Sequence, residues 1–341
     1  MSETTTNTTV RARSASFQVD IVGGGVAGLT VAAALADRGV SVTVLDRAVG
    51  VGAEQCSWWA GGMLAPYCEE ESAEPAVVTH GLRAADWWEA RTGGVVRNGT
   101  LVLANGRDVV ELRRFARRTR AHETVGAEEI GVLEPDLAGR YQTGLFFREE
   151  AHLDPRATLH RLHDYLRRRG VTLSYGTEPT PRARVTVDCR GLAAADALRE
   201  LRGVKGEMLL LRTREISLSR PVRLLHPRHP LYVVPRADGV FMVGATMIES
   251  DDRRRATARS VLELLGAAYA LYPAFAEAEI LEIGVDARPA FPDNLPRVLW
   301  QDGRLFVNGL YRHGFLLAPA MAEQAADQIL QACEVAPCAS S

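Results

Sequence analysis

The sequence predicts an α/β plus α+β protein in which a Rossmann-type nucleotide-binding domain is interleaved with a second domain built on an antiparallel sheet. Three observations support this prediction. A strand, a glycine-rich turn and a helix stand near the N-terminus, strands follow one another without helices after residue 206, and a second strand–glycine–helix pattern lies near the C-terminus. The length of 341 residues also exceeds the usual size of a domain with one core.

Composition excludes several classes of protein. The formal net charge is −2, from 40 basic and 42 acidic residues, so the chain has no general attraction to nucleic acid or to an anionic membrane. The longest charge-free apolar stretch, residues 21–36, is 16 residues long, whereas a membrane-spanning helix needs about 20. We expect no membrane span, no nucleic-acid partner and, since the motifs of common metal sites are absent, no metal.

The chain ends and cysteines indicate location. Residues 1–16 are rich in Thr, Ser and Arg and lack an apolar core, so we expect a disordered tail and not a signal peptide. The five cysteines form no Cys-x-x-Cys pair, which favours reduced thiols and a cytoplasmic location. Lys205 is the single lysine, which leaves little scope for Schiff-base chemistry.

The N-terminal segment has the order of elements that binds a dinucleotide. A strand is predicted at 17–22, a helix at 29–38 and a second strand at 40–45. A Gly-x-Gly-x-x-Gly pattern separates the first strand from the helix, and an acidic residue follows the second strand. This order predicts dinucleotide binding but leaves the choice between FAD and NAD open.

Each part of this pattern has a physical role. Gly23 allows a tight turn, Gly25 has no Cβ to block a pyrophosphate, and Gly28 lets the helix pack closely on the strand. The amides of the helix N-terminus attract phosphate charge, and Asp46 can accept hydrogen bonds from ribose hydroxyls. The predicted cofactor contacts here are Gly23, Gly25, Val26, Ala27, Gly28, Asp46 and Arg47.

Residues 50–66 form a second candidate cofactor segment. They are rich in glycine and other small residues, which lets the backbone lie against a large flat ligand. Apolar side chains such as Trp58 and Trp59 are also costly to leave in water, although an ordinary surface loop is the alternative. The predicted contacts are Ser57, Gly62, Met63 and Leu64.

The middle of the chain supplies the remaining elements. The run of basic residues at 113–120 fits the solvated face of a helix better than a nucleic-acid site. Asp154 caps a helix that Gly170 ends, and the strand at 185–191 is expected to return to the first sheet. The other predicted elements are helices at 74–91 and 257–271 and strands at 98–103, 206–212, 231–235 and 240–247, with a hairpin turn at 237–239.

Near the C-terminus a strand at 305–309 precedes a helix expected at 320–332, with Pro319 at its start. Such a helix end can stabilise the negative charge that reduction places on a flavin ring. The stretch 308–319 resembles the closing motif of FAD-dependent glycine oxidases, the thiamine-biosynthesis branch of the D-amino-acid oxidase superfamily. Three other segments resemble motifs of that branch in the same order: residues 57–70, the hairpin 232–236 with 244–247, and 288–296.

The resemblance covers residues 17–332 and implies a function. It implies oxidation of glycine with oxygen and water to glyoxylate, ammonia and hydrogen peroxide through an imine, in a homo-oligomer and in thiamine synthesis. It places the substrate carboxylate on Arg288 and Arg312, with help from Tyr232, and lines the pocket with Met247, Gly62 and Met63. The further cofactor contacts it implies are Gly191, Gly309, Arg312, His313, Gly314, Phe315 and Leu316.

The resemblance also divides the chain and describes the cofactor. The FAD-binding domain would comprise 17–92, 151–205 and 286–335, and the substrate domain 93–150 and 206–285. Relatives that link the flavin covalently use a cysteine near the position of Arg288, and none lies there, so non-covalent FAD is expected.

Several alternatives stay open at this point. The substrate could be sarcosine or a small D-amino acid, the electron acceptor could be another carrier, and the chain could bind flavin without catalysis. Arg288 could form an ion pair between domains, Arg312 could serve as a helix-cap partner, and Tyr232 could be a core residue with a satisfied hydroxyl. The bulk of Trp58 and Trp59 could reshape the pocket, and residues 176–185 do not reveal the adenine contact.

Overall fold

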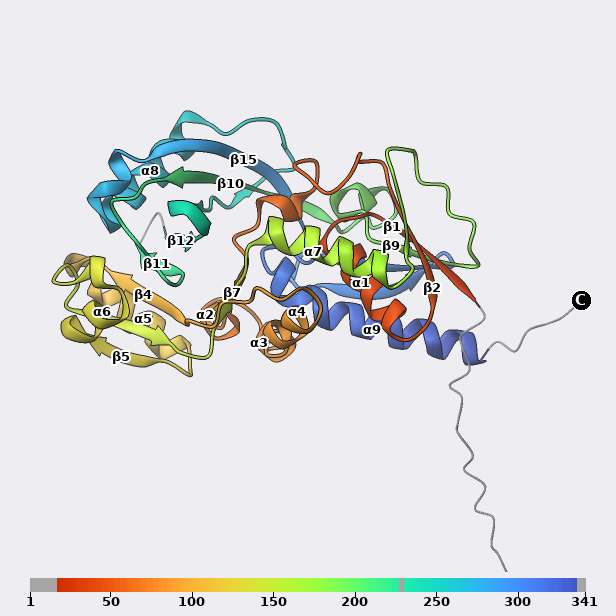
Figure 1. The fold of residues 1–341 in the computed structure, drawn as a ribbon, viewed down its shortest axis with the longest axis horizontal. Helices are drawn as coiled ribbons and strands as arrows, with labels where there is room; N and C mark the ends of the chain where they lie inside the picture. The colour runs from red at the N-terminus through yellow and green to blue at the C-terminus, as the bar shows by residue number, and fades with distance from the viewer. Residues whose placement is uncertain (1–16, 227–229, 336–341) are drawn as a thin grey trace, which may run out of the picture.

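A six-stranded sheet organises the half of the molecule that contains the N-terminal motif (Figure 1). The computed structural model describes residues 17–226 and 230–335, so the tail expected at 1–16 lies outside the described residues. All neighbouring strands are parallel except the pair β16–β17. The strand order is β16 (Arg297–Gln301), β17 (Arg304–Asn308), β9 (Val185–Asp188), β1 (Gln18–Val22), β2 (Ser41–Asp46) and β8 (Thr172–Tyr175).

Helices cover this sheet and close its core. Helix α1 (Val26–Asp37) packs against α9 (Gly314–Val335) and α7 (Pro155–Arg168), and the three lie together in Figure 1. Residues Ala32–Ala34 of α1 are fully buried, and such small side chains let the helices approach closely. The predicted cap of α7 is confirmed, because Asp154 accepts hydrogen bonds from the amides of Arg156 and Ala157.

A nine-stranded sheet organises the other half. Its order is β14 (Ile248–Glu249), β10 (Arg202–Arg212), β13 (Val240–Gly244), β12 (Leu231–Pro235), β11 (Val222–Leu225), β4 (Thr100–Ala104), β6 (Thr143–Phe147) and β5 (Glu123–Gly126), while β15 (Glu279–Ala290) pairs with β10. The expected hairpin at 237–239 connects β12 and β13, and helix α8 (Ala258–Leu271) packs on β10. The sheet is mixed and not purely antiparallel: β11 and β4 run parallel, because they come from distant segments that no hairpin joins.

The prediction of a single helix at 74–91 is wrong. The structure has two helices, α3 (Pro75–Gly81) and α4 (Ala84–Thr92), with the chain turning at Leu82. Gly81 lies against α9 so closely that a Cβ would be 2.8 Å from a methyl group of Leu316. The turn then lets Trp88 of α4 bury its ring against the same helix.

The C-terminal helix also begins earlier than predicted. Helix α9 starts at Gly314, and Pro319 lies inside it, not at its first position. A proline inside a helix cannot donate to the carbonyl four residues before it, which here is that of Phe315. The indole of Trp88 donates to this carbonyl at 2.8 Å. A side chain from α4 thus replaces the missing backbone hydrogen bond, and the helix continues through the proline.

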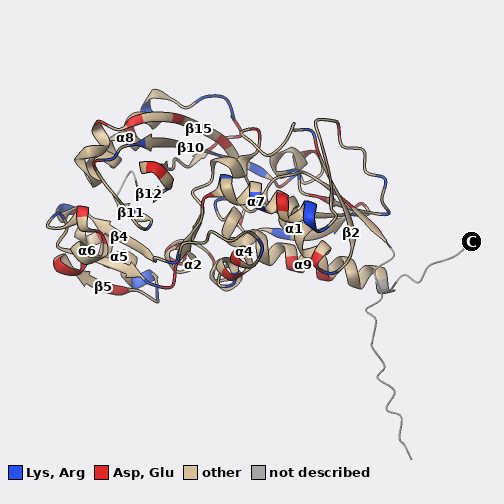
Figure 2. Cartoon of the chain, viewed as in Figure 1, with Lys and Arg blue, Asp and Glu red and all other residues tan. Residues whose placement is uncertain are grey.

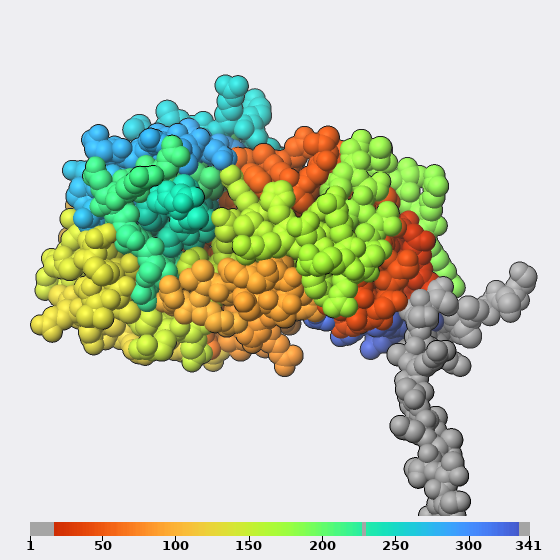
Figure 3. All heavy atoms as spheres, in the orientation of Figure 1, coloured from red at the N-terminus to blue at the C-terminus, as the bar shows by residue number. Residues whose placement is uncertain are grey.

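Short elements link the two halves. They are β3 (Met63–Leu64), paired with β7 (Ala151–His152), and the helix α2 (Pro66–Glu69). The helices α5 (Val109–Arg118) and α6 (Ala127–Leu133) pack on β4, β5 and β6 of the nine-stranded sheet. Figure 3 shows the segment that includes α3 and α4, coloured orange, between the two halves on the face in view. None of the helices in the described part of the chain has the length and apolar character that crossing a membrane requires.

Charges of both signs are distributed over the described part of the chain (Figure 2). The basic run at 113–120 carries several local ion pairs, including Arg118 with Glu71 and Arg120 with Glu70. These arginines therefore belong to a solvated face in which acidic side chains compensate part of the positive charge, as the sequence predicts.

Candidate active site

A cavity of about 1360 Å³ runs between the two sheets. One end lies at the glycine-rich turn after β1, and the other lies against β12, β15 and the start of α9. The predicted site residues Ser57, Gly62, Met63, Gly191, Tyr232, Met247, Arg288, Gly309 and Arg312 all line it. Two predicted cofactor contacts, Gly28 and Leu64, do not line the cavity, because they are buried behind the residues that do. A third, Arg47, lines the cavity, but its side chain is exposed to solvent.

The glycine turn is shaped by close backbone contacts. Gly23 has φ +111°, and a Cβ on it would lie 2.5 Å from the carbonyl oxygen of Cys189. A Cβ on Gly28 would lie 1.8 Å from the carbonyl oxygen of Gly23, so α1 could not pack at this distance with any other residue. A Cβ on Gly25 would meet only the Ser57 hydroxyl, at 3.2 Å. The backbone at Gly25 therefore stays open toward the cavity, as phosphate binding requires.

The acidic residue at the end of β2, Asp46, holds the glycine turn in place. Asp46 accepts hydrogen bonds from the amides of Gly24 and Ala48, at 2.5 and 2.8 Å. Gln55 donates to the carbonyl oxygen of Gly24 at 3.1 Å, while its own side-chain oxygen is buried and has no partner in the described structure. An orphaned acceptor, the α1 amides and a cavity of this size together fit the polar part of a dinucleotide. Sequence reasoning missed Gln55, because a lone polar residue in a loop carries no pattern.

The C-terminal segment lines the cavity with a tight turn between β17 and α9. Gly309 has φ +78°, and a Cβ on it would lie 2.3 Å from the ring of Phe291. The Asn308 side chain accepts from the amide of Gly309 and donates to the carbonyl oxygen of Gly191, which ties the turn to the segment after β9. The first residues of α9, from Gly314 onward, therefore face the cavity with their helix N-terminus, where an anionic ligand is stabilised.

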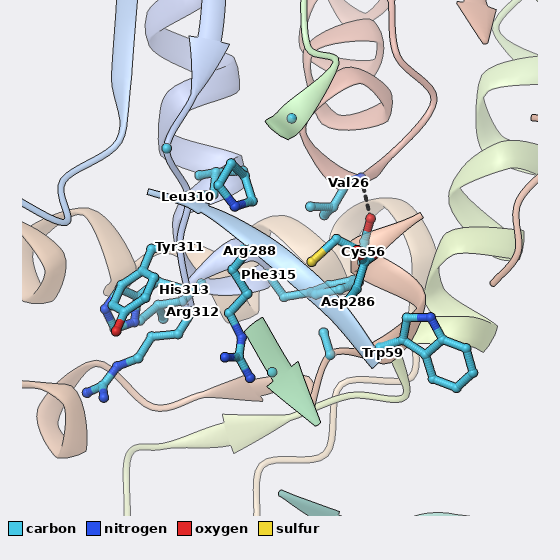
Figure 4. A pocket seen from close by; sticks show the side chains of 18 of the residues that line it. Val26, Cys56, Trp59, Asp286, Arg288, Leu310, Tyr311, Arg312, His313 and Phe315 are labelled. Carbon is cyan, nitrogen blue, oxygen red and sulfur yellow. Dashed lines mark hydrogen bonds between the residues drawn. The ribbon is translucent and has the colours of Figure 1, made fainter. Parts of the chain in front are cut away.

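Arg288 lies on β15 and extends into the cavity (Figure 4). Its Nη1 donates to the carbonyl oxygen of Thr246 at 3.1 Å, and no acidic side chain of the described residues pairs with it. Its guanidinium lies flat on β10, where a Cβ on Gly206 would come within 2.2 Å of Nη2. The interdomain ion pair considered for Arg288 is therefore absent, and its charge is available to a ligand.

Tyr232, on β12, lies between two glycines. A Cβ on Gly244 would be 2.9 Å from the phenol oxygen, and one on Gly61 would be 3.1 Å from the ring. Burial raises the pKa of Tyr232, so the hydroxyl stays protonated. No hydrogen bond joins this hydroxyl to another described residue, and the side chain lines the cavity. The hydroxyl is a free donor and not the satisfied core group considered as an alternative.

Arg312 has a protein partner that sequence reasoning missed. Its Nη2 donates to Glu69 at 2.6 Å and to the Ser72 hydroxyl at 2.9 Å, and its Nη1 lies 3.6 Å from the sulfur of Met247. Arg223 donates to the other oxygen of Glu69, at 2.5 Å. Glu69 lies in the segment 57–70, but only the folded chain reveals its two arginine partners.

Titratable groups near these arginines are held in fixed states. Burial opposes ionisation of Glu69, but the charges of Arg312 and Arg223 outweigh it and hold the pKa of this carboxyl well below its ordinary range. Burial lowers the pKa of His313 to about 4, against the attraction of Glu69, so its ring is neutral at pH 7. Burial, followed by the charge of Asp286, raises the pKa of the Cys56 thiol to about 12. None of these three groups is therefore a proton acceptor with a pKa near 7.

Comparisons with known proteins identify the family of this chain. A model of the family described as FAD dependent oxidoreductase matches residues 18–328. The chain is 58% identical over 317 residues to a putative thiamine biosynthesis oxidoreductase of Rhizobium etli, covering 92% of this chain and 97% of that protein. It is 26% identical to a glycine oxidase of Bacillus licheniformis, with 92% and 93% covered.

Solved structures show the same fold. A glycine oxidase of Bacillus cereus superposes with a TM-score of 0.78 at 21% identity, covering 93% of this chain and 96% of that one. The Rossmann-type domain expected from the sequence is thereby confirmed. With a family match along nearly the whole length and a cavity whose backbone suits a dinucleotide, the chain belongs to the family of FAD dependent oxidoreductases, and FAD is its cofactor.

Proposed function

We propose that this enzyme oxidises glycine, with oxygen as the electron acceptor. Glycine, oxygen and water would give glyoxylate, ammonia and hydrogen peroxide, with the imine formed first and then hydrolysed by water. Bound FAD would accept the hydride, and with it both electrons, that leaves the substrate. The similarity to glycine oxidases supports this proposal, and the name of the Rhizobium etli relative supports a place in thiamine synthesis.

The observation that carries the proposal is the pairing of Arg288 with Tyr232 at one end of the cavity. In the part of the chain that the structure describes, the guanidinium has no acidic partner and the phenol has no hydrogen-bond partner, and both line the same cavity. A substrate carboxylate satisfies both groups through charge-assisted hydrogen bonds. Arg312 contributes the N–H groups that do not already donate to Glu69 or Ser72. We infer that a carboxylate of the substrate binds here.

The amine of the substrate is treated differently. Arg288, Arg312 and Arg223 bring three positive charges to this end of the cavity, against the ionised Glu69. Excess positive charge lowers the pKa of a nearby ammonium group. We infer that the substrate reacts as the neutral amine, and that its proton leaves to solvent without a dedicated side-chain base.

Anaerobic titration of the FAD-loaded protein tests this proposal. Glycine, sarcosine, D-alanine and D-proline are added in turn, and the absorbance of oxidised flavin is followed. Glycine is expected to bleach the flavin fastest, and air is expected to restore the colour with one peroxide per glycine. Faster bleaching by sarcosine or a D-amino acid would assign the alternative substrate. Bleaching that air does not reverse would point to another electron acceptor, and no bleaching by any of the four would overturn the proposal.

A further inference from the structure

One protein carboxylate lies among the arginines of the proposed substrate site. Glu69 is 7% exposed, and its two oxygens accept from Arg223 and Arg312 at 2.5 and 2.6 Å. It comes from α2, whereas Arg223 comes from β11 and Arg312 from the turn before α9. Three separate segments therefore meet at one anionic side chain.

This arrangement divides the arginines into two kinds. The charges of Arg312 and Arg223 share one internal counterion, Glu69, and the buried Glu150 also lies beside Arg223. Among the described residues, Arg288 has only the carbonyl oxygen of Thr246 as a partner. Figure 4 shows the side chains of Arg288 and Arg312 extending toward the same side of the ribbon, with their guanidinium groups apart. A ligand carboxylate that approached Nη2 of Arg312 would thus meet a nitrogen that Glu69 already binds.

A second carboxylate on the substrate would have to compete with Glu69. The nitrogen of Arg312 that binds Glu69 also donates to Ser72, and its other terminal nitrogen faces the sulfur of Met247. A second substrate carboxylate at Arg312 would therefore lie beside an ionised side chain in a partly desolvated site, where like charges repel strongly. An ionised group that repels the wrong ligand is a common basis of specificity.

We propose that Glu69 restricts the site to amines with one carboxylate and excludes amines with two, such as iminodiacetate. Glu69 acts as an internal substitute for the second carboxylate: it fills the arginine position that a dicarboxylate would otherwise use. The inference rests on the proposed function, because it assumes that Arg288 anchors the first carboxylate of the substrate.

Two ligands that cannot be oxidised allow the effect of ligand charge on binding to be measured without turnover. Methoxyacetate carries one carboxylate, and diglycolate is its counterpart with two; neither has an amine to oxidise. Their dissociation constants are measured on the FAD-loaded protein from the change in flavin absorbance, with no turnover. The proteins are the wild type, Glu69→Gln and Ser72→Ala, which removes the other Arg312 partner without changing charge.

The wild type is expected to bind methoxyacetate at least as tightly as diglycolate, although diglycolate has twice the charge. Glu69→Gln is expected to shift the ratio of the two constants toward diglycolate by about tenfold or more, and Ser72→Ala by less than about twofold. An unchanged ratio in Glu69→Gln, or an equal shift in Ser72→Ala, would overturn the proposal.

Three further outcomes are informative. Glu69→Gln leaves two partly buried guanidinium groups without their shared counterion and can fail to fold. The wild-type ratio is then decisive, because tighter binding of diglycolate by tenfold contradicts the role of Glu69. If neither ligand perturbs the flavin of the wild type, the carboxylate site itself is wrong, and both this inference and the proposed function fail. A changed substrate preference with intact glycine oxidation would concern the inference alone.

Discussion

The substitution Gly206→Ala tests whether Arg288 anchors the substrate carboxylate, because it displaces the guanidinium without replacing Arg288 itself. The added methyl group would lie 2.2–2.4 Å from three atoms of the guanidinium. These atoms are the far end of a flexible side chain, so Arg288 moves while the backbone of β10 stays in place. Gly206 pairs with Asp286 in a regular strand and has no positive φ, so alanine itself introduces no backbone strain.

The expected effect follows from the contact that is displaced. A hydrogen bond to a charged group contributes about 1.5–3 kcal/mol, so loss of the Arg288 contact weakens carboxylate binding by about 10- to 150-fold. The dissociation constant of methoxyacetate and the KM for glycine are expected to rise by this factor. The melting temperature should change little.

Two variants frame this measurement. Arg288→Met removes the guanidinium and sets the upper limit of the effect. Gly266→Ala adds a methyl group in α8, where nothing lies within 4 Å of the new Cβ, and should leave binding unchanged. Wild-type affinity in Gly206→Ala, together with weak binding in Arg288→Met, would show that the guanidinium need not lie on β10 to bind the ligand.

Three other substitutions test the fold and the cofactor site. Gly28→Ala places a Cβ 1.8 Å from a backbone oxygen. We therefore expect the free energy of unfolding to fall by more than about 2 kcal/mol and the protein to purify without the colour of FAD. Normal colour and stability would contradict the role of this contact. Trp88→Phe leaves the Phe315 carbonyl without its hydrogen bond, so we expect the free energy of unfolding, measured with denaturant, to fall by about 1–3 kcal/mol. The loss should be smaller in a Pro319→Ala background, because the amide of the new alanine can then donate to this carbonyl. Equal losses in both backgrounds would refute the idea that Trp88 compensates for the proline. Burial raises the pKa of Glu150 from 4.5 to about 7, so the native state holds a proton that the unfolded chain has released, and stability falls by up to about 3 kcal/mol as pH rises from about 4.5 to 7. Glu150→Gln should remove this fall, so that the variant gains on the wild type in unfolding experiments from pH 5 to 8; parallel curves would show that Glu150 ionises normally.

Local patterns were readable from the sequence because their causes are local. The glycine turn depends on backbone contacts between neighbouring elements, so Gly23 and Gly28 are identifiable from spacing alone. The helix at Pro155 is similarly fixed by the capping carboxylate one residue before it. The predicted boundary between domains at residue 286 is of another kind: β15 runs from Glu279 to Ala290 through that position, so no local signal marks it.

Features that depend on distant partners were not readable. Pro319 predicted a helix start, because nothing in the sequence indicates that Trp88 will bind the carbonyl that the proline leaves free. Glu69 is likewise one acid among three consecutive ones, and its importance appears only when Arg223 and Arg312 converge on it. In both cases the decisive contact joins residues that are far apart in the sequence.

The two arginines predicted to share one substrate carboxylate therefore do not have equal roles. A charge that already has a buried protein counterion gains less from a ligand than a charge that has only a carbonyl oxygen as a partner. Arg312 is in the first situation and Arg288 is in the second. Replacing Arg288 should consequently weaken carboxylate binding directly, whereas replacing Arg312 should first disturb Glu69 and the chain around it. The ionised Glu69 thus accounts both for the ion-paired state of Arg312 and for the proposed limit of one carboxylate per substrate.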